Sequence, residues 1–281
     1  MELSNRVVIV TGASAGIGRE IAIRMAAENA SLVLAARSRQ PLVDLAEHLQ
    51  HNVANCSRTL VVPTDVCKAD DLQGLVDAAL AEFGRIDVLV NNAGVECFDY
   101  FERLNAEQIS ATIQTNLTGA LLLTHLTVPQ MLKQGGGSII NMASTAGKHC
   151  PAFESVYGAT KAALIAFTQG LRAEYEGRGI KVSSICPGFT RNGGIYERML
   201  QDGGRKPPKA LGSTSASKVA RTVLKAIMYG GPEYIVNDPP VRPAIVLREI
   251  FPRLGEKLIT AVTRRFVKQA VDARPSERKA A

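Results

Sequence analysis

The stretch VVIVTGASAGIG, residues 7–18, decides the fold of this chain. Apolar, β-branched residues give way to Thr11, Gly12 and Gly16, and residues 17–28 then show the period of an amphipathic helix. Glycines between a buried strand and a helix permit a tight turn, and the helix N-terminus favours the negative charge of a phosphate. The spacing TGxxxGxG differs by one residue from the GxGxxG dinucleotide fingerprint, so a purely structural turn is the alternative interpretation.

Strand-like and helix-like segments alternate along the rest of the chain. Helices are expected at residues 17–28, 41–50, 69–82, 106–133, 155–176 and 215–229. Short, almost continuously apolar runs lie at residues 6–11, 31–36, 58–63, 86–90, 137–143, 180–186 and 233–236. Apolar strands that are followed by helices predict a parallel sheet covered on both faces. We therefore expect an α/β fold, a doubly wound, Rossmann-like sheet of about seven strands that binds ligands at the carboxyl ends of the strands.

Length and composition fit a single large domain with an extension. The chain has 281 residues, of which 46% are hydrophobic, and we place the main domain at residues 1–240 and a helical extension at residues 241–281. The first apolar run is already a strand, and no uninterrupted apolar stretch reaches ~18 residues, so we expect a cytoplasmic protein. The cysteines match no metal-ligand or disulfide spacing, and we expect no metal and five free thiols: Cys56, Cys67, Cys97, Cys150 and Cys186.

Positive charge is concentrated in the extension. Residues 241–281 hold ten Lys and Arg against four Asp and Glu, which is +6 of the formal net charge of +7. The main domain is nearly neutral, so we expect no nucleic-acid-binding face on it. Apolar residues recur at helical spacing between the cations: Leu247, Ile250, Phe251, Leu254, Leu258, Val262, Phe266 and Ala270. This basic amphipathic pattern fits contact with an anionic membrane surface, docking on the main domain, or contact with a second subunit.

The end of the second expected strand indicates which dinucleotide is bound. It reads AARSR at residues 35–39, without the carboxylate that holds the ribose 2′-hydroxyl of NAD. The guanidinium of Arg37 can instead bind the 2′-phosphate of NADP through a planar fork of donors. We predict NADP(H), with Ser14 as a further donor and with Arg39 as either a second contact or a solvated side chain.

Two further segments are expected beside the same cofactor. Asp65 follows the third strand and can accept from the adenine amino group, or serve as a helix N-cap. The sequence NNAG at residues 91–94 follows the fourth strand, where a simple strand-end turn is the alternative. The candidate cofactor-binding residues up to this point are Gly12, Ser14, Gly16, Ile17, Gly18, Arg37, Asp65, Asn92, Ala93 and Gly94.

A tyrosine and a lysine stand four residues apart in SVYGATKAALIAF, residues 155–167. Tyr157 and Lys161 share one face of the expected helix, so the ammonium lies close to the phenol. A positive charge there favours the phenolate and lowers the tyrosine pKa from its ordinary value of about 10. The pair can then exchange a proton with an alcohol or a ketone, although a YxxxK pair is also a common surface pattern.

The chain contains, in sequence order, TGASAGIG, NNAG, Asn116, Ser144 and the pair Tyr157 and Lys161. By these motifs the chain resembles the short-chain dehydrogenase/reductase family, in its single-domain branch. The resemblance covers residues 7–188 approximately and thins beyond them. It implies an oxidoreductase in which hydride moves between a nicotinamide and a ketone, an aldehyde or an acyl-chain carbonyl, or the corresponding alcohol. It also implies a homo-oligomer.

The resemblance implies a role for each of four catalytic residues. Tyr157 would exchange the proton with the substrate oxygen, and Ser144 would hydrogen-bond that oxygen as negative charge develops. Lys161 would hold the nicotinamide ribose and lower the Tyr157 pKa, and Asn116 would connect Lys161 to water. In the segment after the sixth strand, Thr190 and Asn192 are alternatives for contact with the nicotinamide amide. The candidate cofactor-binding residues are completed by Tyr157, Lys161, Pro187, Gly188 and Thr190.

Substrate specificity is expected to arise in three loops at the strand ends, residues 95–101, 145–153 and 189–211, with a substrate lid at about 189–212. These loops are rich in aromatic and aliphatic residues, which fits a mostly apolar substrate of moderate size. The polar residues in or beside them include Glu96, His149 and Glu154. Three weaker hypotheses concern these loops: His149 carries a proton, Cys97 and Cys150 line the pocket, and the basic run 205–209 binds the phosphates of a thioester substrate. For each of them, an ordinary loop residue without such a role is the alternative.

Two other classes of protein are weighed against the reductase. A cofactor-sensing or scaffold protein of the same fold would have little reason to keep Asn116, Ser144, Tyr157 and Lys161 together. A sugar-nucleotide epimerase or dehydratase would need a large C-terminal substrate domain, which we do not expect in residues 241–281. The sequence therefore favours an NADPH-dependent carbonyl reductase.

Overall fold

The computed structural model describes residues 3–53, 58–191 and 212–272. In this part of the chain seven parallel strands form one sheet in the order β3-β2-β1-β4-β5-β6-β9. The strands are β1 (Val7–Thr11), β2 (Ser31–Ala36), β3 (Thr59–Pro63), β4 (Val88–Asn91), β5 (Gly137–Met142), β6 (Ile180–Pro187) and β9 (Glu233–Val236). The strand order reverses between β1 and β4, which confirms the doubly wound fold and places the crevice for ligands at their carboxyl ends.

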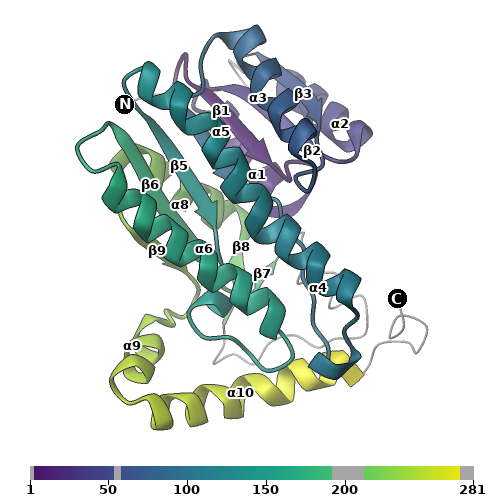
Figure 1. Cartoon of the computed structure of the whole chain (residues 1–281), viewed down its shortest axis with the longest axis vertical. Coiled ribbons are helices and arrows are strands. Elements are labelled where there is room, and N and C mark those ends of the chain that lie inside the picture. Colours follow the sequence, from purple (N-terminus) through teal and green to yellow (C-terminus); the bar gives the residue numbers. More distant parts are fainter. Residues whose placement is uncertain (1–2, 54–57, 192–211, 273–281) are drawn as a thin grey trace.

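Helices cover both faces of this sheet, as Figure 1 shows. They are α1 (Gly16–Ala26), α2 (Arg39–Asn52), α3 (Ala69–Phe83), α5 (Gly119–Lys133), α6 (Ser155–Glu174) and α8 (Ala216–Tyr229). One buried apolar cluster joins the sheet to α1, α2 and α8, and a second joins it to α3, α5 and α6. The strands therefore bury both faces, which is why their sequences are apolar almost throughout.

The expected helix over residues 106–133 is interrupted in the structure. It consists of α4 (Ala106–Ile113), a π-helical turn η2 (Gln114–Thr118) and α5. Asn105 caps α4 in a reciprocal capping box with Gln108. The π turn contains the buried Asn116, and such turns often lie at functional sites.

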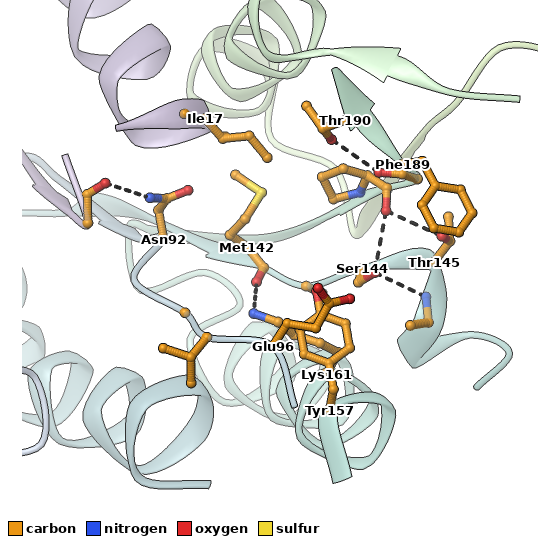
Figure 2. A pocket seen from close by; sticks show the side chains of 18 of the residues that line it. Ile17, Asn92, Glu96, Met142, Ser144, Thr145, Tyr157, Lys161, Phe189 and Thr190 are labelled. Atoms are coloured by element: carbon orange, nitrogen blue, oxygen red, sulfur yellow. Dashed lines mark hydrogen bonds between the residues drawn. The ribbon is translucent and has the colours of Figure 1, made fainter. Parts of the chain in front are cut away.

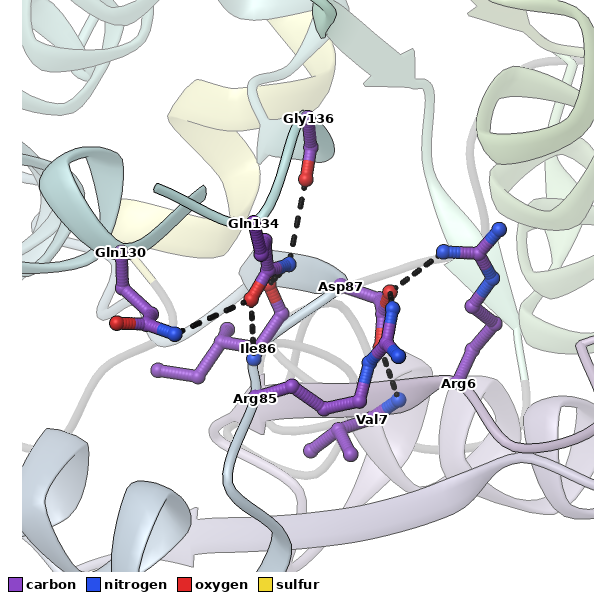
Figure 3. A network of polar contacts seen from close by, with 8 residues as sticks. All are labelled: Arg6, Val7, Arg85, Ile86, Asp87, Gln130, Gln134 and Gly136. Carbon is purple, nitrogen blue, oxygen red and sulfur yellow. Dashed lines mark hydrogen bonds and ion pairs between the residues drawn. The ribbon is translucent and has the colours of Figure 1, made fainter. Parts of the chain in front are cut away.

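A polar network ties the strands together at the end of the sheet where the strands begin (Figure 3). The buried carboxylate of Asp87, just before β4, accepts hydrogen bonds from Arg6 Nη1 at 2.6 Å, Arg85 Nε at 2.8 Å and the Val7 backbone N–H at 2.9 Å. The side chain of Gln134 donates to the carbonyl of Ile86 at 2.6 Å. Because this network lies at the opposite end of the strands from the crevice, its role is structural.

The C-terminal extension folds back onto the main domain. It contains α9 (Arg242–Ile250) and the long helix α10 (Pro252–Asp272), which together lie along one end of the molecule in Figure 1. Val267 and Val271 of α10 are buried against Phe98 and its aromatic neighbours. Of the three roles that the sequence left open, docking on the chain's own domain is thus observed. In the described part of the chain, no helix combines the length and apolar character needed to cross a membrane.

The predicted lid falls almost entirely outside the described residues, as do Asn192 and the basic run 205–209. The short strands β7 (Thr190–Arg191) and β8 (Thr214–Ser215) pair on either side of it.

Candidate active site

The glycine turn brings the backbone close to itself and to the end of β4. Gly12 has φ +65°, and a Cβ on Gly18 would lie 2.2 Å from the carbonyl oxygen of Gly12. Neither position therefore accepts a side chain without displacement of the turn. The helix α1 begins at Gly16, and no acidic residue lies in its first turn. The turn thus offers close backbone approach and free helix N–H groups, which fits the diphosphate of a dinucleotide.

The segment after β4 is fixed against this turn by Thr11. The hydroxyl Oγ1 of Thr11 accepts from the backbone N–H groups of Asn92 at 2.9 Å and of Ala93 at 3.0 Å. The side-chain amide of Asn92 donates to the Thr11 carbonyl at 2.9 Å. Residues 92–94, which the sequence placed beside the cofactor, are therefore held at the floor of the crevice.

The end of β2 and the segment after β3 supply residues to one end of the cavity. Arg37 is exposed and lines the cavity with Ser38, whereas Arg39 is the first residue of α2 and is not part of the lining. Asp65 also lines the cavity, and its carboxyl accepts from the Cys67 backbone N–H at 3.1 Å. Since α3 begins only at residue 69, with Lys68 in the N-cap position, the alternative role of Asp65 as that N-cap is wrong.

The candidate proton-transfer residues converge on one wall of the crevice (Figure 2). Tyr157 and Lys161 lie one turn apart in α6 and are buried. Lys161 Nζ donates to the carbonyl of Met142 at 2.9 Å and lies 5.7 Å from the centroid of the Tyr157 ring. Ser144 follows β5 and acts on the pKa of the Tyr157 phenol, and its Oγ donates to the Pro187 carbonyl at 3.5 Å. Its Oγ also accepts from the Ala146 backbone N–H at 3.1 Å.

Asn116 lies behind this wall and does not line the cavity itself. Its Oδ1 accepts from the Val95 backbone N–H at 2.7 Å, and its Nδ2 donates to the Val95 carbonyl at 2.8 Å and to Thr160 Oγ1 at 3.2 Å. Asn116 therefore joins the loop after β4 to the helix that carries Tyr157 and Lys161. A Cβ on Gly94 would approach its Oδ1 to 3.3 Å and Lys161 Nζ to 3.5 Å.

The electrostatic environment of Tyr157 differs from the one that the sequence predicts. Burial raises the pKa of Tyr157 above its ordinary value, the carboxyl of Glu96 raises it further, and the side chain of Ser144 lowers it. Burial also lowers the pKa of Lys161 to about 8. The Tyr157 pKa is therefore raised, and not lowered as the sequence predicts, because burial disfavours the charged phenolate.

A single cavity of about 570 Å³ connects the two ends of the site. All the predicted cofactor-binding residues line it, as do Ser144 and the polar residues Glu96, His149 and Glu154. Cys97 and Cys150 do not line it, and the four described cysteines, which include Cys67 and Cys186, form no disulfide. Among the described residues, no group of His, Cys, Asp and Glu side chains has the arrangement of a metal site.

The sequence did not predict that the C-terminal extension lines the same cavity. Part of the wall is formed by Val241, Ala244, Ile245, Leu258, Ile259 and Thr263. The amphipathic pattern of residues 247–270 indicated a docked helix, but the pattern does not specify which surface the helix meets. The wall is mostly apolar, which agrees with the expected character of the substrate.

Two of the comparisons with known proteins concern families and curated sequences. Residues 6–199 match the family model described as short chain dehydrogenase. A ketoacyl reductase, HetN, of Nostoc sp. is 37% identical over 262 residues, which cover 93% of this chain and 88% of that protein. An uncharacterised oxidoreductase of Staphylococcus epidermidis is 38% identical over 188 residues, covering 67% of this chain and 79% of that protein.

A solved structure shows the same architecture. The crystal structure of levodione reductase superimposes with a TM-score of 0.76 at 28% sequence identity. The match covers 83% of this chain and 96% of the reductase. The fold and the order of the elements that build the site are therefore shared well beyond the glycine turn.

Proposed function

This chain belongs to the short-chain dehydrogenase family and is an oxidoreductase, and from that premise we propose that it is an NADPH-dependent carbonyl reductase. The observation that carries the proposal is the convergence of Tyr157, Ser144 and Lys161 on one wall of a cavity whose other end holds the glycine turn and Arg37. A protein that only sensed the cofactor would need the end with the glycine turn and Arg37, but not the wall that holds Tyr157, Ser144 and Lys161.

The residues at the nucleotide end fit NADP(H). The turn at Gly12 and Gly18 leaves room for a diphosphate, and Arg37 lines the cavity where the 2′-phosphate would lie. No carboxylate stands in residues 35–39 to repel that phosphate. Among the residues at the other end, Thr190 lines the cavity beside Pro187 and Gly188 and is our candidate for contact with the nicotinamide amide.

The residues on the wall that holds Tyr157 have different roles in the proposed proton transfer. When bound, the nicotinamide supplies hydride to a carbonyl carbon or accepts it from an alcohol. Tyr157 gives its proton to the carbonyl oxygen during reduction, and Ser144 stabilises the negative charge that develops on that oxygen. Lys161 holds the ribose and contributes positive charge beside the phenol, while Asn116 positions the loop at Val95 against α6.

The substrate is proposed to be a small, mostly apolar ketone, aldehyde or acyl-chain carbonyl. The apolar residues of the extension in the cavity wall support this choice. The names of the two relatives, a ketoacyl reductase and levodione reductase, point in the same direction. We further propose residues 1–240 as the catalytic domain, a lid at about 189–212, residues 241–281 as an extension, a cytoplasmic location and assembly into a homo-oligomer.

Turnover across a substrate panel tests this proposal. We expect NADPH oxidation with at least one class among cyclic ketones, steroids, retinoids, sugars and ketoacyl thioesters. Tyr157→Phe removes the proton donor and keeps the ring, so the turnover should fall at least about 100-fold while NADPH binding stays nearly unchanged. A Tyr157→Phe protein that turns over like the wild type would contradict the assignment.

Peripheral contact with an anionic membrane is part of the proposal. Around the corner between α9 and α10, five large apolar side chains are between 47% and 64% exposed: Val246, Ile250, Phe251, Leu254 and Leu258. Exposed cations follow the same two helices: Arg242, Arg253, Lys257, Arg264 and Arg265. Apolar residues beside cations suit a surface of anionic lipid, whereas a two-fold contact between two copies would bring the cations together.

Co-sedimentation with vesicles tests the membrane contact. The protein should bind vesicles that contain phosphatidylserine more strongly than pure phosphatidylcholine, and the double variant Phe251→Ser, Leu254→Ser should lose most of this binding. Tyr229→Ser, which removes a side chain that is 78% exposed elsewhere, is the matched control. Equal binding by both variants would refute the contact, and a dimer that dissociates only in the double variant would assign the surface to a second subunit.

A further inference from the structure

The substrate end of the cavity contains a carboxyl that the proposed chemistry does not use. Glu154 precedes α6, is only 4% exposed, and lines the cavity one helical turn before Tyr157. Its backbone carbonyl accepts from the Gly158 N–H at 2.7 Å and from Cys150 Sγ at 3.3 Å. Its side chain does not cap the helix, and within the described residues it has no hydrogen bond or ion pair. Since a buried carboxyl without a partner is costly, its place in the cavity wall points to a ligand.

A second carboxyl faces the same wall. Glu96 follows β4 and lines the cavity, and Figure 2 shows its side chain beside Tyr157. Burial raises the pKa of Glu154 well above its ordinary value, and the charge of Glu96 raises it further. Both effects favour the protonated form of the Glu154 carboxyl, which can donate as well as accept a hydrogen bond.

Among the residues that the structure describes, the other charged groups around the cavity leave Glu154 available. Lys161 Nζ is directed to the Met142 carbonyl, and Arg37 lies at the nucleotide end. His149 also lines the cavity, where its Nε2 is buried without a hydrogen-bond partner, and the charges of Arg248 and Glu256 act on this imidazole. The remaining wall is largely apolar, which strengthens any hydrogen bond that a ligand makes to the carboxyl pair.

We propose that Glu154, with Glu96 beside it, determines substrate specificity by binding a hydrogen-bond-donating substituent, a hydroxyl or a protonated amine, of the carbonyl substrate. The charge of Glu154 acts on the Tyr157 phenol, so this substituent lies a few bonds from the carbonyl oxygen that meets Tyr157. An anionic substituent at the same place is repelled. The inference rests on the proposed function, because it names the substrate class of that site.

A matched set of ketones tests the inference with NADPH as the reductant. The probes are cyclohexanone, hydroxycyclohexanone, aminocyclohexanone and oxocyclohexanecarboxylate, with the substituent next to or opposite the ketone. The wild type should prefer the hydroxy or the amino ketone over cyclohexanone. Glu154→Leu should lower kcat/KM for the preferred ketone about 10- to 100-fold, leave cyclohexanone nearly unchanged, and improve the anionic ketone.

Two further variants separate the sources of this preference and control for folding. Glu154→Gln keeps a hydrogen-bond acceptor without charge, so it should retain part of a preference for the hydroxyl but lose one for the amine. Glu174→Gln changes an exposed residue at the other end of α6 and should leave every ratio unchanged. If Glu154→Leu lowers kcat/KM for all four ketones by one factor, Glu154 is only structural and the inference is overturned.

Binding measurements keep the inference distinct from the proposed function. Ligand-observed NMR can compare the four ketones on Tyr157→Phe loaded with NADPH, with and without the additional Glu154→Leu change. Weaker binding of the hydroxy or amino ketone in the double variant supports the inference even if the wild type reduces none of the probes, a result that would count against the reductase. Binding that is indifferent to Glu154 overturns the inference whether or not turnover is seen.

Discussion

At the scale of the residue, the proposed preference for NADP(H) rests on Arg37. It is exposed, lines the cavity directly after β2, and has no acidic residue beside it in residues 35–39. Arg37→Glu replaces a donor for the 2′-phosphate with a group that repels it and can hold a 2′-hydroxyl. We expect the preference for NADPH over NADH, measured as a ratio of Kd values at low salt, to fall by about 100-fold.

The neighbouring arginine provides the control for this prediction. Arg39 is also exposed but lies in the first turn of α2, outside the cavity lining. Arg39→Glu makes the same change of charge and should shift the ratio of Kd values far less. A wild-type protein that binds NADH as tightly as NADPH, or equal effects of the two substitutions, would contradict the assignment of Arg37.

Also at the residue scale, the surroundings of Tyr157 keep the phenol protonated. Burial and the carboxyl of Glu96 both raise the Tyr157 pKa, so the phenol keeps its proton across the neutral range. A protonated phenol is the form that reduction of a carbonyl requires. An unshifted phenol is also protonated at neutral pH, so the raised pKa does not set the direction of the reaction. The sequence pair Tyr157 and Lys161 did not predict the raised pKa, because Glu96 comes from a distant segment.

At the scale of the element, the segment that contains Asn116 shows that a periodic pattern predicts a helix but not an interruption within it. Residues 106–133 have the hydrophobic period of one helix, and the π turn at Gln114–Thr118 changes no residue type that would mark it. The turn is associated with a tertiary contact, since the amide of Asn116 pairs with both backbone groups of Val95. The position of this side chain was predicted from the family resemblance, and its contacts are visible only in the structure.

The network at the start of β4 gives a prediction for stability. Asp87 is buried, and hydrogen bonds from Arg85, the Val7 N–H and Arg6 overcome the opposing effect of burial and lower its pKa. A lowered carboxyl pKa stabilises the fold above the unfolded-state pKa of about 4, and this contribution is lost as the pH falls through the folded-state value. Asp87→Asn should therefore cost about 3 kcal/mol of unfolding free energy at neutral pH and much less in acid.

Denaturant unfolding at several pH values checks this prediction. Asp77→Asn is the control, because Asp77 is an exposed residue of α3 that accepts only from Gln73, and it should change stability by less than about 0.5 kcal/mol. If the destabilisation by Asp87→Asn is the same at pH values above and below the carboxyl pKa, the ionised carboxylate is not what stabilises this end of the sheet.

At the scale of the whole molecule, the fold and the meeting of the glycine turn with residues 91–94 were predictable because they depend on local patterns. Apolar strands, the glycine turn and the segment at residues 91–94 are each contiguous in sequence, and parallel strands bring their carboxyl ends together. The substrate end was not predictable in the same way. Its wall combines Glu96, Glu154 and helices α9 and α10, whose meeting is a result of tertiary packing.

The docked extension contributes both to the cavity and to the surface that is proposed to contact a membrane. Leu258 lines the cavity and is also 52% exposed, so the apolar surface at the corner of α9 and α10 is continuous with the wall of the substrate site. A molecule that binds membranes through this surface would place its substrate cavity next to the lipid. This arrangement suits the mostly apolar substrates that the cavity wall favours.

Transfer of deuterium from the cofactor tests most directly the central claim, that the carbonyl carbon takes hydride from the cofactor while the carbonyl oxygen takes a proton from Tyr157. NADPH that carries deuterium at the reactive nicotinamide carbon is incubated with the protein and the most active ketone, and the alcohol product is examined by mass spectrometry. We expect one deuterium in the product of the wild type and almost no product from Tyr157→Phe with NADPH still bound. Product without deuterium, or equal amounts of labelled product from both proteins, would contradict the claim.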